Sequence, residues 1–200
     1  SKITLKLSQE KNIKIFGIDD LSNGKYSNIP KNIEFIQGDL SNYRILDKLP
    51  KGCAQILHLA GQSSGEKSFE NPILDLKKNV HSSLNLINFG IENKVKKFIY
   101  ASSMSVYGNQ KFHKVKENDH CQPLSCYGVG KMAVENYMYI YKNKLPFVSM
   151  RMFNVYGPGQ NLDDLKQGMV SIFLAQAIKN NKIVIKGGLN RIRDFIYMVK

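Results

Sequence analysis

The chain has 200 residues, of which 42% are hydrophobic and 22% are charged, ordinary values for a globular protein with a buried core. The net charge of +13 comes from 29 lysines and arginines that are scattered along the chain, and only four of them are arginine. Readers of nucleic acid rely on arginine for bidentate contacts, so the composition argues against a nucleic-acid partner. No apolar run approaches the length of a membrane span. Three cysteines are too few for a disulfide framework and favour the reducing cytoplasm.

Short apolar segments that end at turn residues predict strands over 13–18, 33–37, 53–59, 97–102, 146–153 and 182–186. Between them, apolar residues spaced by three or four predict helices over 2–11, 42–49, 71–92, 125–143 and 168–180. Stretches rich in Gly, Asn and Ser predict loops over 22–28, 61–65, 108–125 and 154–168. This alternation predicts an α/β fold, in which helices cover both faces of a parallel sheet.

In such a sheet, ligands bind at the carboxyl ends of the strands. Asp19 follows the first strand, where a carboxylate can hydrogen-bond the ribose of a dinucleotide and favours NAD over NADP. An ordinary turn after a strand would use the same residue. The hydroxyls of Ser102, Ser103 and Ser105 follow the fourth strand and are expected at the same edge, although a Ser-rich turn is an alternative.

Tyr127 and Lys131 are four residues apart in the helix predicted over 125–143, so they share one helix face. A neighbouring ammonium favours the phenolate and lowers the pKa of a tyrosine, which makes it usable as a base near neutral pH. Such a pair also occurs by chance in many helices. Gly128 and Gly130 permit close approach of another backbone or of a cofactor.

Other polar residues carry weaker signals. Four potential metal ligands fall close together, but their spacing does not match a familiar zinc site, and no metal is expected. His58 lies inside an apolar strand and is interpreted as a packed, hydrogen-bonded residue. Arg193 could bind a diphosphate bidentately, or it could form a surface ion pair. The four metal-ligand candidates are His113, His120, Cys121 and Cys126.

The order and spacing of the motifs resemble those of the extended short-chain dehydrogenase/reductase family, and within it the NAD-dependent epimerases and dehydratases of the UDP-glucose 4-epimerase type. The resemblance implies a Rossmann-like, doubly wound parallel sheet, with an NAD-binding domain over 1–160 and the start of a smaller substrate-binding region over 161–200. The motifs are Ile18-Asp19-Asp20-Leu21-Ser22-Asn23-Gly24, Gly38-Asp39-Leu40, His58-Leu59-Ala60-Gly61-Gln62-Ser63-Ser64, Asn79, Ser102-Ser103-Met104-Ser105-Val106-Tyr107-Gly108, Tyr127 with Lys131, Arg151-Met152-Phe153-Asn154 and Arg193-Asp194-Phe195.

The resemblance implies that Tyr127 is the base, that Lys131 binds the nicotinamide ribose and that Ser103 orients the sugar hydroxyl. Substrate binding is implied for Ser103, Tyr127, Asn154 and Arg193, with Arg193 at the diphosphate. NAD binding is implied for Asp19, Asp20, Leu21, Ser22, Asn23, Gly24, Asp39, Leu40, Leu59, Ala60, Gly61, Gln62, Ser63, Asn79, Ser103, Tyr127, Lys131 and Phe153.

The implied reaction is epimerisation of a nucleotide sugar. Tyr127 removes a hydroxyl proton while hydride passes to NAD, and hydride then returns to the opposite face of the keto sugar. Met104-Ser105 stands where the family's dehydratases carry Asp-Glu and where its decarboxylases carry Glu at the second position, so elimination and decarboxylation are disfavoured. A nucleotide-sugar reductase or dehydrogenase of the same fold and an inactive fragment remain alternatives. By analogy, the helices 71–92 and 125–143 are candidates for a homodimer interface.

Two differences from the family pattern concern the ends of the sequence. The family begins with a strand and a G-x-x-G-x-x-G loop that binds pyrophosphate at a helix N-terminus, and we find no such segment here. Lys200 stands where an Asp is usual, just before the family's substrate domain. We therefore expect an interior piece of a longer enzyme, in which the neighbours of the absent first strand are unpaired.

Overall fold

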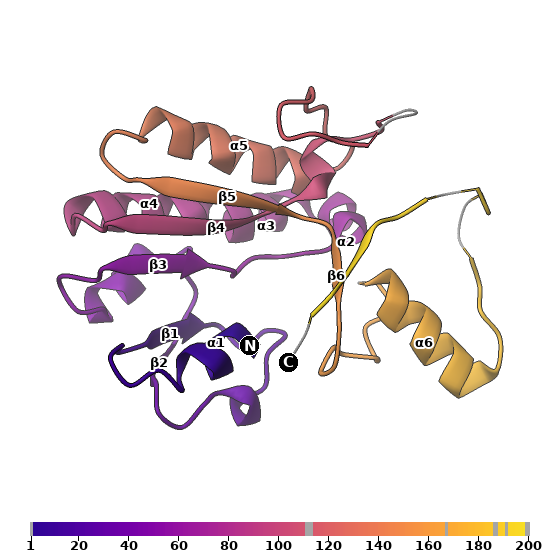
Figure 1. Cartoon of the computed structure of the whole chain (residues 1–200), viewed down its shortest axis with the longest axis horizontal. Helices are drawn as coiled ribbons and strands as arrows, with labels where there is room; N and C mark the ends of the chain where they lie inside the picture. Colours follow the sequence, from indigo (N-terminus) through magenta and orange to yellow (C-terminus); the bar gives the residue numbers. More distant parts are fainter. Residues whose placement is uncertain (1, 111–113, 167, 186–187, 191, 199–200) are drawn as a thin grey trace.

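The structure, a computed structural model, describes residues 2–110, 114–166, 168–185, 188–190 and 192–198. Strands and helices alternate along most of the chain, as expected for an α/β protein (Figure 1). The helices are α1 (Lys2–Leu7), α2 (Gly65–Glu70), α3 (Pro72–Leu76), α4 (Ser82–Glu92), α5 (Cys126–Ile140) and α6 (Met169–Asn180). The strands are β1 (Phe16–Asp19), β2 (Glu34–Gln37), β3 (Gln55–His58), β4 (Lys97–Ser103), β5 (Phe147–Met152), β6 (Asn154–Tyr156) and β7 (Phe195–Tyr197).

The strands form three parallel groups. β1 pairs with β2, and the central sheet has the order β3-β4-β5. Within the described residues, these two groups share no strand pair, so the edges of β1 and β3 are unpaired, as the sequence leads us to expect. β6 pairs with β7, which places Asn154 opposite Phe195. Figure 1 shows β1 and β2 below β3, and β6 turned away from the central sheet.

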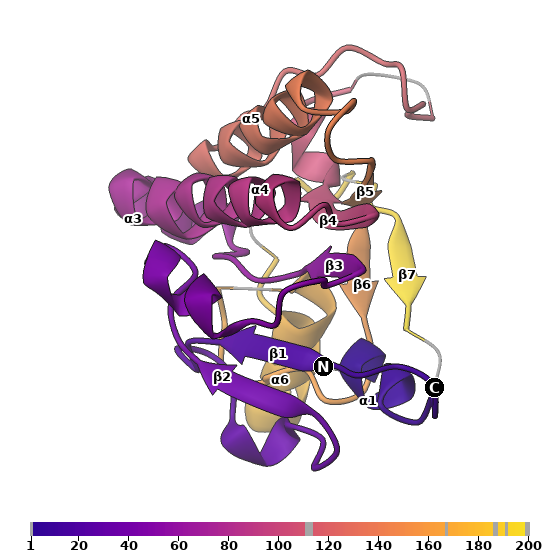
Figure 2. The ribbon, with the colours of Figure 1, turned by 90° about the vertical axis from the view of Figure 1, so that its left-hand side faces the viewer.

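The helices that shape the site begin at side-chain caps. Asn71 accepts a hydrogen bond from the Leu74 N–H, with Pro72 at the first position of α3, an arrangement that favours a helix start. Ser125 caps α5 by accepting from the Gly128 N–H. Figure 2 shows α3, α4 and α5 together on one side of the strands and α1 on the opposite side. No helix in the described part of the chain is long and apolar enough to span a bilayer.

The hydrophobic core lies between the central sheet and the helices α4 and α5. Phe98 and Tyr100 of β4 are fully buried. They belong to one cluster with Ile87 of α4 and with Val134 and Met138 of α5. This packing fixes α5 against β4, and both elements carry candidate site residues.

The element boundaries differ from the sequence-based prediction in several places. Helix 2–11 ends at Leu7, helix 42–49 is a 3-10 helix (Tyr43–Lys48), and helix 71–92 contains a π-helical turn (Lys77–His81). The predicted strand 182–186 is wrong over its described residues, 182–185, and residue 186 lies outside them. There the Val184 N–H donates to Gln176 of α6 instead of to a neighbouring strand.

β6 and β7 were not predicted as strands. Their pairing joins residues about forty positions apart, which local patterns do not reveal. The predicted loop 154–168 therefore begins with a strand.

Candidate functional site

The candidate site lies where β4 ends and α5 begins. Ser103 is the last residue of β4, and a 3-10 turn (Met104–Val106) follows it. The Ser103 side chain accepts from the Ser105 N–H at 3.2 Å, and its oxygen lies 3.1 Å from the Ser105 hydroxyl. These contacts hold the Ser103 hydroxyl at the carboxyl edge of the central sheet.

Gly128 lets the first turn of α5 pack directly on this strand end. A Cβ at Gly128 would lie 2.7 Å from the carbonyl oxygen of Ser105 and 2.9 Å from Cβ of Pro123. A larger residue would displace the helix. The expectation of close backbone approach at this glycine is thus confirmed, and the same turn of α5 carries Tyr127.

Lys131 is the buried cation of the site. Its side chain is 5% exposed, and Nζ donates to the carbonyl oxygen of Ala101 at 2.9 Å. Nζ also lies 4.8 Å from the ring centroid of Tyr100 and 5.5 Å from that of Tyr127. Burial lowers the pKa of Lys131 to about 8, and the charge of Asp75 partly offsets this effect. The structure therefore brings together Ser103, Tyr127 and Lys131.

The pKa of Tyr127 differs from the sequence-based expectation. Burial raises it, a hydrogen bond with Ser103 lowers it and the charge of Asp75 raises it, with a net upward shift. The expected lowering by Lys131 is therefore not seen. The reason is that the phenol is largely removed from water, while the Lys131 ammonium is directed to a backbone carbonyl.

A buried polar cluster lies behind Lys131. Asp75 of α3 is 2% exposed, and its Oδ1 accepts from Gln62 Nε2 at 2.8 Å and from Asn79 Nδ2 at 2.9 Å. Asp75 was not predicted from the sequence as a site residue. The residues three, four, seven and eight positions after it are Lys78, Asn79, Ser82 and Ser83, so this helix face is polar and an acid on it has no distinctive pattern.

A second group of polar residues lies at the carboxyl ends of β1 and β2. Asp19 accepts from the Leu21 N–H at 2.8 Å, which is the turn that we gave as the alternative to ribose binding. Asp20 accepts from the Ser22 N–H at 2.9 Å and from the Ser22 hydroxyl at 2.6 Å. Asp39 accepts from the Ser41 N–H at 2.9 Å. Local turns therefore order all three carboxylates.

Lys78 connects two of these carboxylates to the π-helical turn. Its Nζ lies 2.7 Å from Oδ2 of Asp20 and 2.9 Å from Oδ2 of Asp39. Burial alone would raise the pKa of Asp20, but hydrogen bonds from Lys78 and Ser22 lower it to about 2. In the sequence, Lys78 is one of many scattered lysines, and only the fold shows that β1 and β2 end beside it.

Comparison with known proteins gives the family. A profile of the NAD dependent epimerase/dehydratase family matches residues 1–199. The chain belongs to this family. Its residues are 32% identical over 193 positions to a putative UDP-glucose 4-epimerase of Methanocaldococcus jannaschii, covering 94% of this chain and 63% of that protein.

Solved structures of the epimerase/dehydratase family have the same fold. UDP-glucose 4-epimerase of Thermotoga maritima with UDP-glucose superimposes with a TM-score of 0.88 at 30% identity, covering 98% of this chain and 65% of that one. The Thermus thermophilus enzyme with NAD gives 0.85 at 26% identity, covering 97% and 66%. The chain thus has the Rossmann-like α/β fold and spans about two thirds of the length of these relatives.

The family's cofactor is NAD, and one feature of the π-helical turn fits a dinucleotide. Asn79 is 1% exposed, and its Oδ1 has no hydrogen-bond partner among the described residues. Gly61 lies against this oxygen with φ of +145°, and a Cβ there would collide with it. A buried acceptor without a donor, beside a glycine that leaves the backbone open, suits a ligand that donates a hydrogen bond. π-helical turns are frequent at functional sites.

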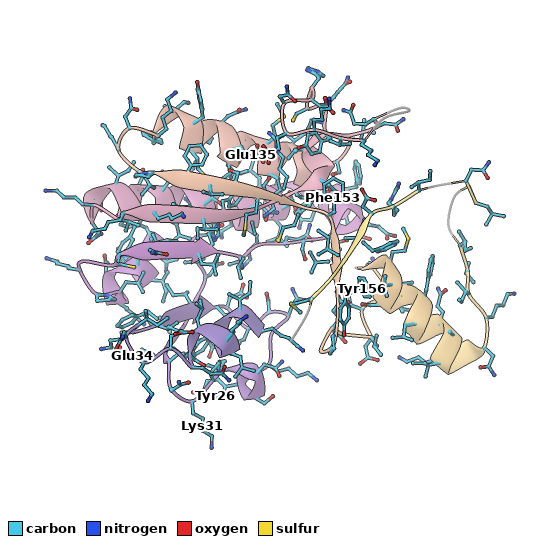
Figure 3. The ribbon with its side chains drawn as sticks, in the orientation of Figure 1. Tyr26, Lys31, Glu34, Glu135, Phe153 and Tyr156 are labelled. Atoms are coloured by element: carbon cyan, nitrogen blue, oxygen red, sulfur yellow. The ribbon has the colours of Figure 1, made fainter. Side chains whose placement is uncertain are left out.

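The remaining residues that the family resemblance assigns to NAD vary in exposure. Leu59, Gly61 and Ser63 are exposed after β3, and Ser22, Asn23 and Gly24 are exposed after β1. Leu40 differs, because its side chain lies in the hydrophobic core and its carbonyl accepts from Asn85. Phe153 lies between β5 and β6 (Figure 3).

The resemblance assigns Asn154 and Arg193 to the substrate and not to NAD. The pairing of β6 with β7 brings the two segments that carry them side by side. Asn154 Nδ2 donates to the carbonyl oxygen of Asp194 at 2.7 Å and lies 3.8 Å from the sulfur of Met104. Asn154 therefore lies near the turn that follows Ser103. Arg193 Nη1 donates to the carbonyl oxygen of Ile192 at 2.9 Å.

The packed interpretation of His58 is confirmed. This side chain is 2% exposed, Nε2 lies 2.8 Å from the Ser83 hydroxyl, and burial lowers the pKa to about 3. Of the four metal-ligand candidates, His113 lies outside the described residues. Cys53, Cys121 and Cys126 are free thiols.

Proposed function

We propose that this chain is the NAD-binding and catalytic part of an enzyme that epimerises a nucleotide sugar of the UDP-glucose/UDP-galactose type at C4. The observation that supports this most directly is the meeting of Ser103, Tyr127 and Lys131 at the end of β4. A hydroxyl, a phenol and an ammonium there can position a sugar hydroxyl and move its proton.

Each of these side chains has a role that follows from its surroundings. Tyr127 accepts the proton of the sugar hydroxyl and later returns it, while Ser103 hydrogen-bonds the same oxygen. Lys131 supplies positive charge next to the phenol and a donor for a ribose hydroxyl. The chemistry that bound NAD would supply is reversible hydride transfer with the sugar carbon. Residues 1–160 would bind the dinucleotide, and 161–200 would begin the substrate-binding region.

The turn after Ser103 favours epimerisation over related reactions. Met104 and Ser105 carry no carboxylate, and the Ser105 hydroxyl lies 3.1 Å from that of Ser103. A thioether and a neutral hydroxyl cannot supply the acid–base pair that elimination of water needs. A nucleotide-sugar reductase of the same fold is the second candidate, and it differs by a net change in NADH.

The acidic residues at the ends of β1 and β2 support NAD over NADP. Asp19, Asp20 and Asp39 lie together there, and carboxylates repel a ribose 2′-phosphate while accepting bonds from free hydroxyls. Equal binding of NAD and NADP by the protein would contradict this part of the proposal.

The test of the proposed function has two steps. Purified protein is denatured, and any released dinucleotide is identified by mass spectrometry. The protein is then incubated with UDP-galactose, and the sugar product and net NADH are measured. Bound NAD and formation of UDP-glucose without net NADH would support the proposal. Net formation of NADH would favour a dehydrogenase and net consumption of added NADH a reductase, and a folded protein with neither NAD nor turnover would support the inactive alternative.

A homodimer through α3 and α5 also remains a proposal. Ile73 and Leu76 of α3 are 74% and 53% exposed, and Tyr139 and Ile140 of α5 are 62% and 70% exposed. Large apolar side chains in such numbers are typical of an interface. Analytical ultracentrifugation of wild type and Ile140→Glu would test it, since only the wild type should sediment as a dimer.

Three free thiols agree with the reducing cytoplasm that we expect as the location.

A further inference from the structure

Asp75 carries a buried carboxylate to which the proposed reaction gives no role. It is 2% exposed and lies on α3, whereas Tyr127 and Lys131 lie on α5. The two helices are in direct contact beside it, since a Cβ built on Gly130 would lie 3.7 Å from Asp75 Oδ2 and 3.4 Å from Val80. The carboxylate therefore faces the turn of α5 that carries Lys131.

The hydrogen bonds of Asp75 do not by themselves require an acid. Both donors are neutral amides, from Gln62 and Asn79, and both reach the same oxygen, Oδ1. An asparagine could accept such bonds through its own Oδ1. Burying a charge is costly unless an opposite charge lies nearby. An interaction with a cation would therefore explain why an aspartate, and not an asparagine, stands at this position.

Lys131 is the cation that meets this requirement. It is 5% exposed, and its Nζ contacts a neutral carbonyl and two aromatic rings. Asp75 is the carboxylate that raises the pKa of Lys131 against the effect of burial, and Lys131 in turn lowers the pKa of Asp75, which burial raises. Each charge thus stabilises the other in a site that is shielded from water.

We propose that Asp75 is a positioning residue of the catalytic site: its carboxylate is the counter-charge of the Lys131 ammonium, and Gln62 and Asn79 hold it in place. This inference rests on the proposed function, which assigns Tyr127 and Lys131 to catalysis. It also couples the loop after β3 to Lys131, because Gln62 belongs to that loop and donates to the same carboxylate.

Other titratable groups also interact electrostatically with this pair. Asp75 also raises the pKa of Tyr127 and of Tyr100, and Lys131 lowers that of the buried His58. Glu135 raises the pKa of Tyr100 as well, but it is paired with Arg151 at 2.8 Å. A measurement at Lys131 itself separates its coupling to Asp75 from these neighbours.

The experiment follows the Lys131 side chain by NMR in protein with labelled lysine and without dinucleotide or sugar. Lys131→Arg identifies the Lys131 signal. We expect Lys131 to titrate near pH 8 in the wild type. In Asp75→Asn, which keeps the shape and removes the charge, we expect the titration about one pH unit lower. Asp75→Glu should return it toward the wild-type value, and Asp47→Asn, at an exposed position, should leave it unchanged.

Two results would overturn the proposal. One is a Lys131 titration in folded Asp75→Asn, checked by circular dichroism, that equals the wild-type one. The other uses the wild type alone and does not depend on the folding of a variant. If Asp75 and Lys131 are coupled, the Lys131 signal must shift when the Asp75 carboxyl, followed by its own carbon resonance, gains a proton. A Lys131 signal that does not respond to protonation of Asp75 would contradict the proposal.

The outcome can be told apart from failure of the proposed function, because the titrations need no bound NAD. A shifted Lys131 in a protein that binds no dinucleotide would uphold the Asp75 pairing and contradict the proposed function. An unshifted Lys131 in a protein that binds NAD would do the opposite. Where NAD binds, the alkaline loss of NAD affinity should begin about one pH unit earlier in Asp75→Asn than in the wild type.

Discussion

Lys131 and Lys78 lie in the two halves of the site, and folding shifts their pKa values in opposite directions. Lys131 is 5% exposed, and burial lowers its pKa to about 8. The side chain of Lys78 is 24% exposed. Burial lowers its pKa too, but hydrogen bonds with Asp20 and Asp39 raise it above the ordinary value. Burial therefore lowers the pKa of Lys131, whereas ion pairs stabilise the charged form of Lys78.

This difference reflects how each half is built. The half around Lys131 is formed by the central sheet with α4 and α5, which pack around fully buried side chains, and by α3, which carries the buried Asp75. The half around Lys78 is formed by the two short strands β1 and β2, with turns ordered by carboxylates. Figure 3 shows Glu135 and Phe153 in the first half, and Glu34 and Tyr26 in the second. Buried packing can set the acidity of a reacting group, whereas exposed ion pairs mainly fix position.

The largest expected effect lies in the buried half. Tyr127→Phe removes the group that moves the sugar proton, so turnover of UDP-galactose should fall by about 10²–10⁴-fold. NAD binding should be almost unchanged, because the ring remains. Steady-state kinetics together with the NAD content of the purified variant would check this. Unchanged turnover would remove Tyr127 from the catalytic role.

Gly128 and Gly130 offer a matched pair of stability tests in the same helix. Gly128→Ala places a Cβ 2.7 Å from the Ser105 carbonyl oxygen and should cost about 1–3 kcal/mol of unfolding free energy. Gly130→Ala meets ordinary contacts of 3.4 Å and more and should gain up to about 1 kcal/mol. Urea denaturation measures both. Equal effects of the two changes would contradict close packing at the start of α5.

The pH dependence of stability tests whether burial sets the pKa of Lys131. The folded pKa of about 8 lies below the reference value of 10.5, so the unfolded chain binds more protons between these values. Unfolding free energy should therefore rise with pH across this window, by about 1 kcal/mol per pH unit from this group. Lys131→Met should lack that rise in urea titrations at pH 8 and pH 9.5. A parallel rise in both proteins would show that Lys131 is not the cause.

The smallest effect is expected in the exposed half. Lys78→Met should cost about 1 kcal/mol at pH 6, because it breaks two partly exposed ion pairs. The pKa of Asp20 is about 2 when folded, against a reference value of 3.8, so its contribution is complete above about 4 and is lost as the pH falls toward 2. The variant should therefore lose less stability between pH 5 and pH 3 than the wild type. Thermal unfolding at both pH values would test this, with Asp47→Asn as a control for general charge loss.

Much of the arrangement of the site residues could be predicted from the sequence. The strand ends that carry Asp19, Asp39 and Ser103 follow from apolar segments closed by turn residues, and the shared face of Tyr127 and Lys131 follows from helical spacing. Asp75 and Lys78 were missed, because an acid in one helix and a lysine pair show no pattern of their own. Their partners lie in elements far away along the chain.

Local periodicity and motif spacing are enough to establish the α/β class, the family and the set of side chains available at the sheet edge. Folding in three dimensions settled which charges meet and which lose water. It placed Asp75 behind Lys131 and Lys78 between two carboxylates, and it raised the pKa of Tyr127, which the sequence had suggested would fall. The physical reason is that a pKa depends on burial and on charges brought close by folding, and neither quantity is a property of residues taken in order.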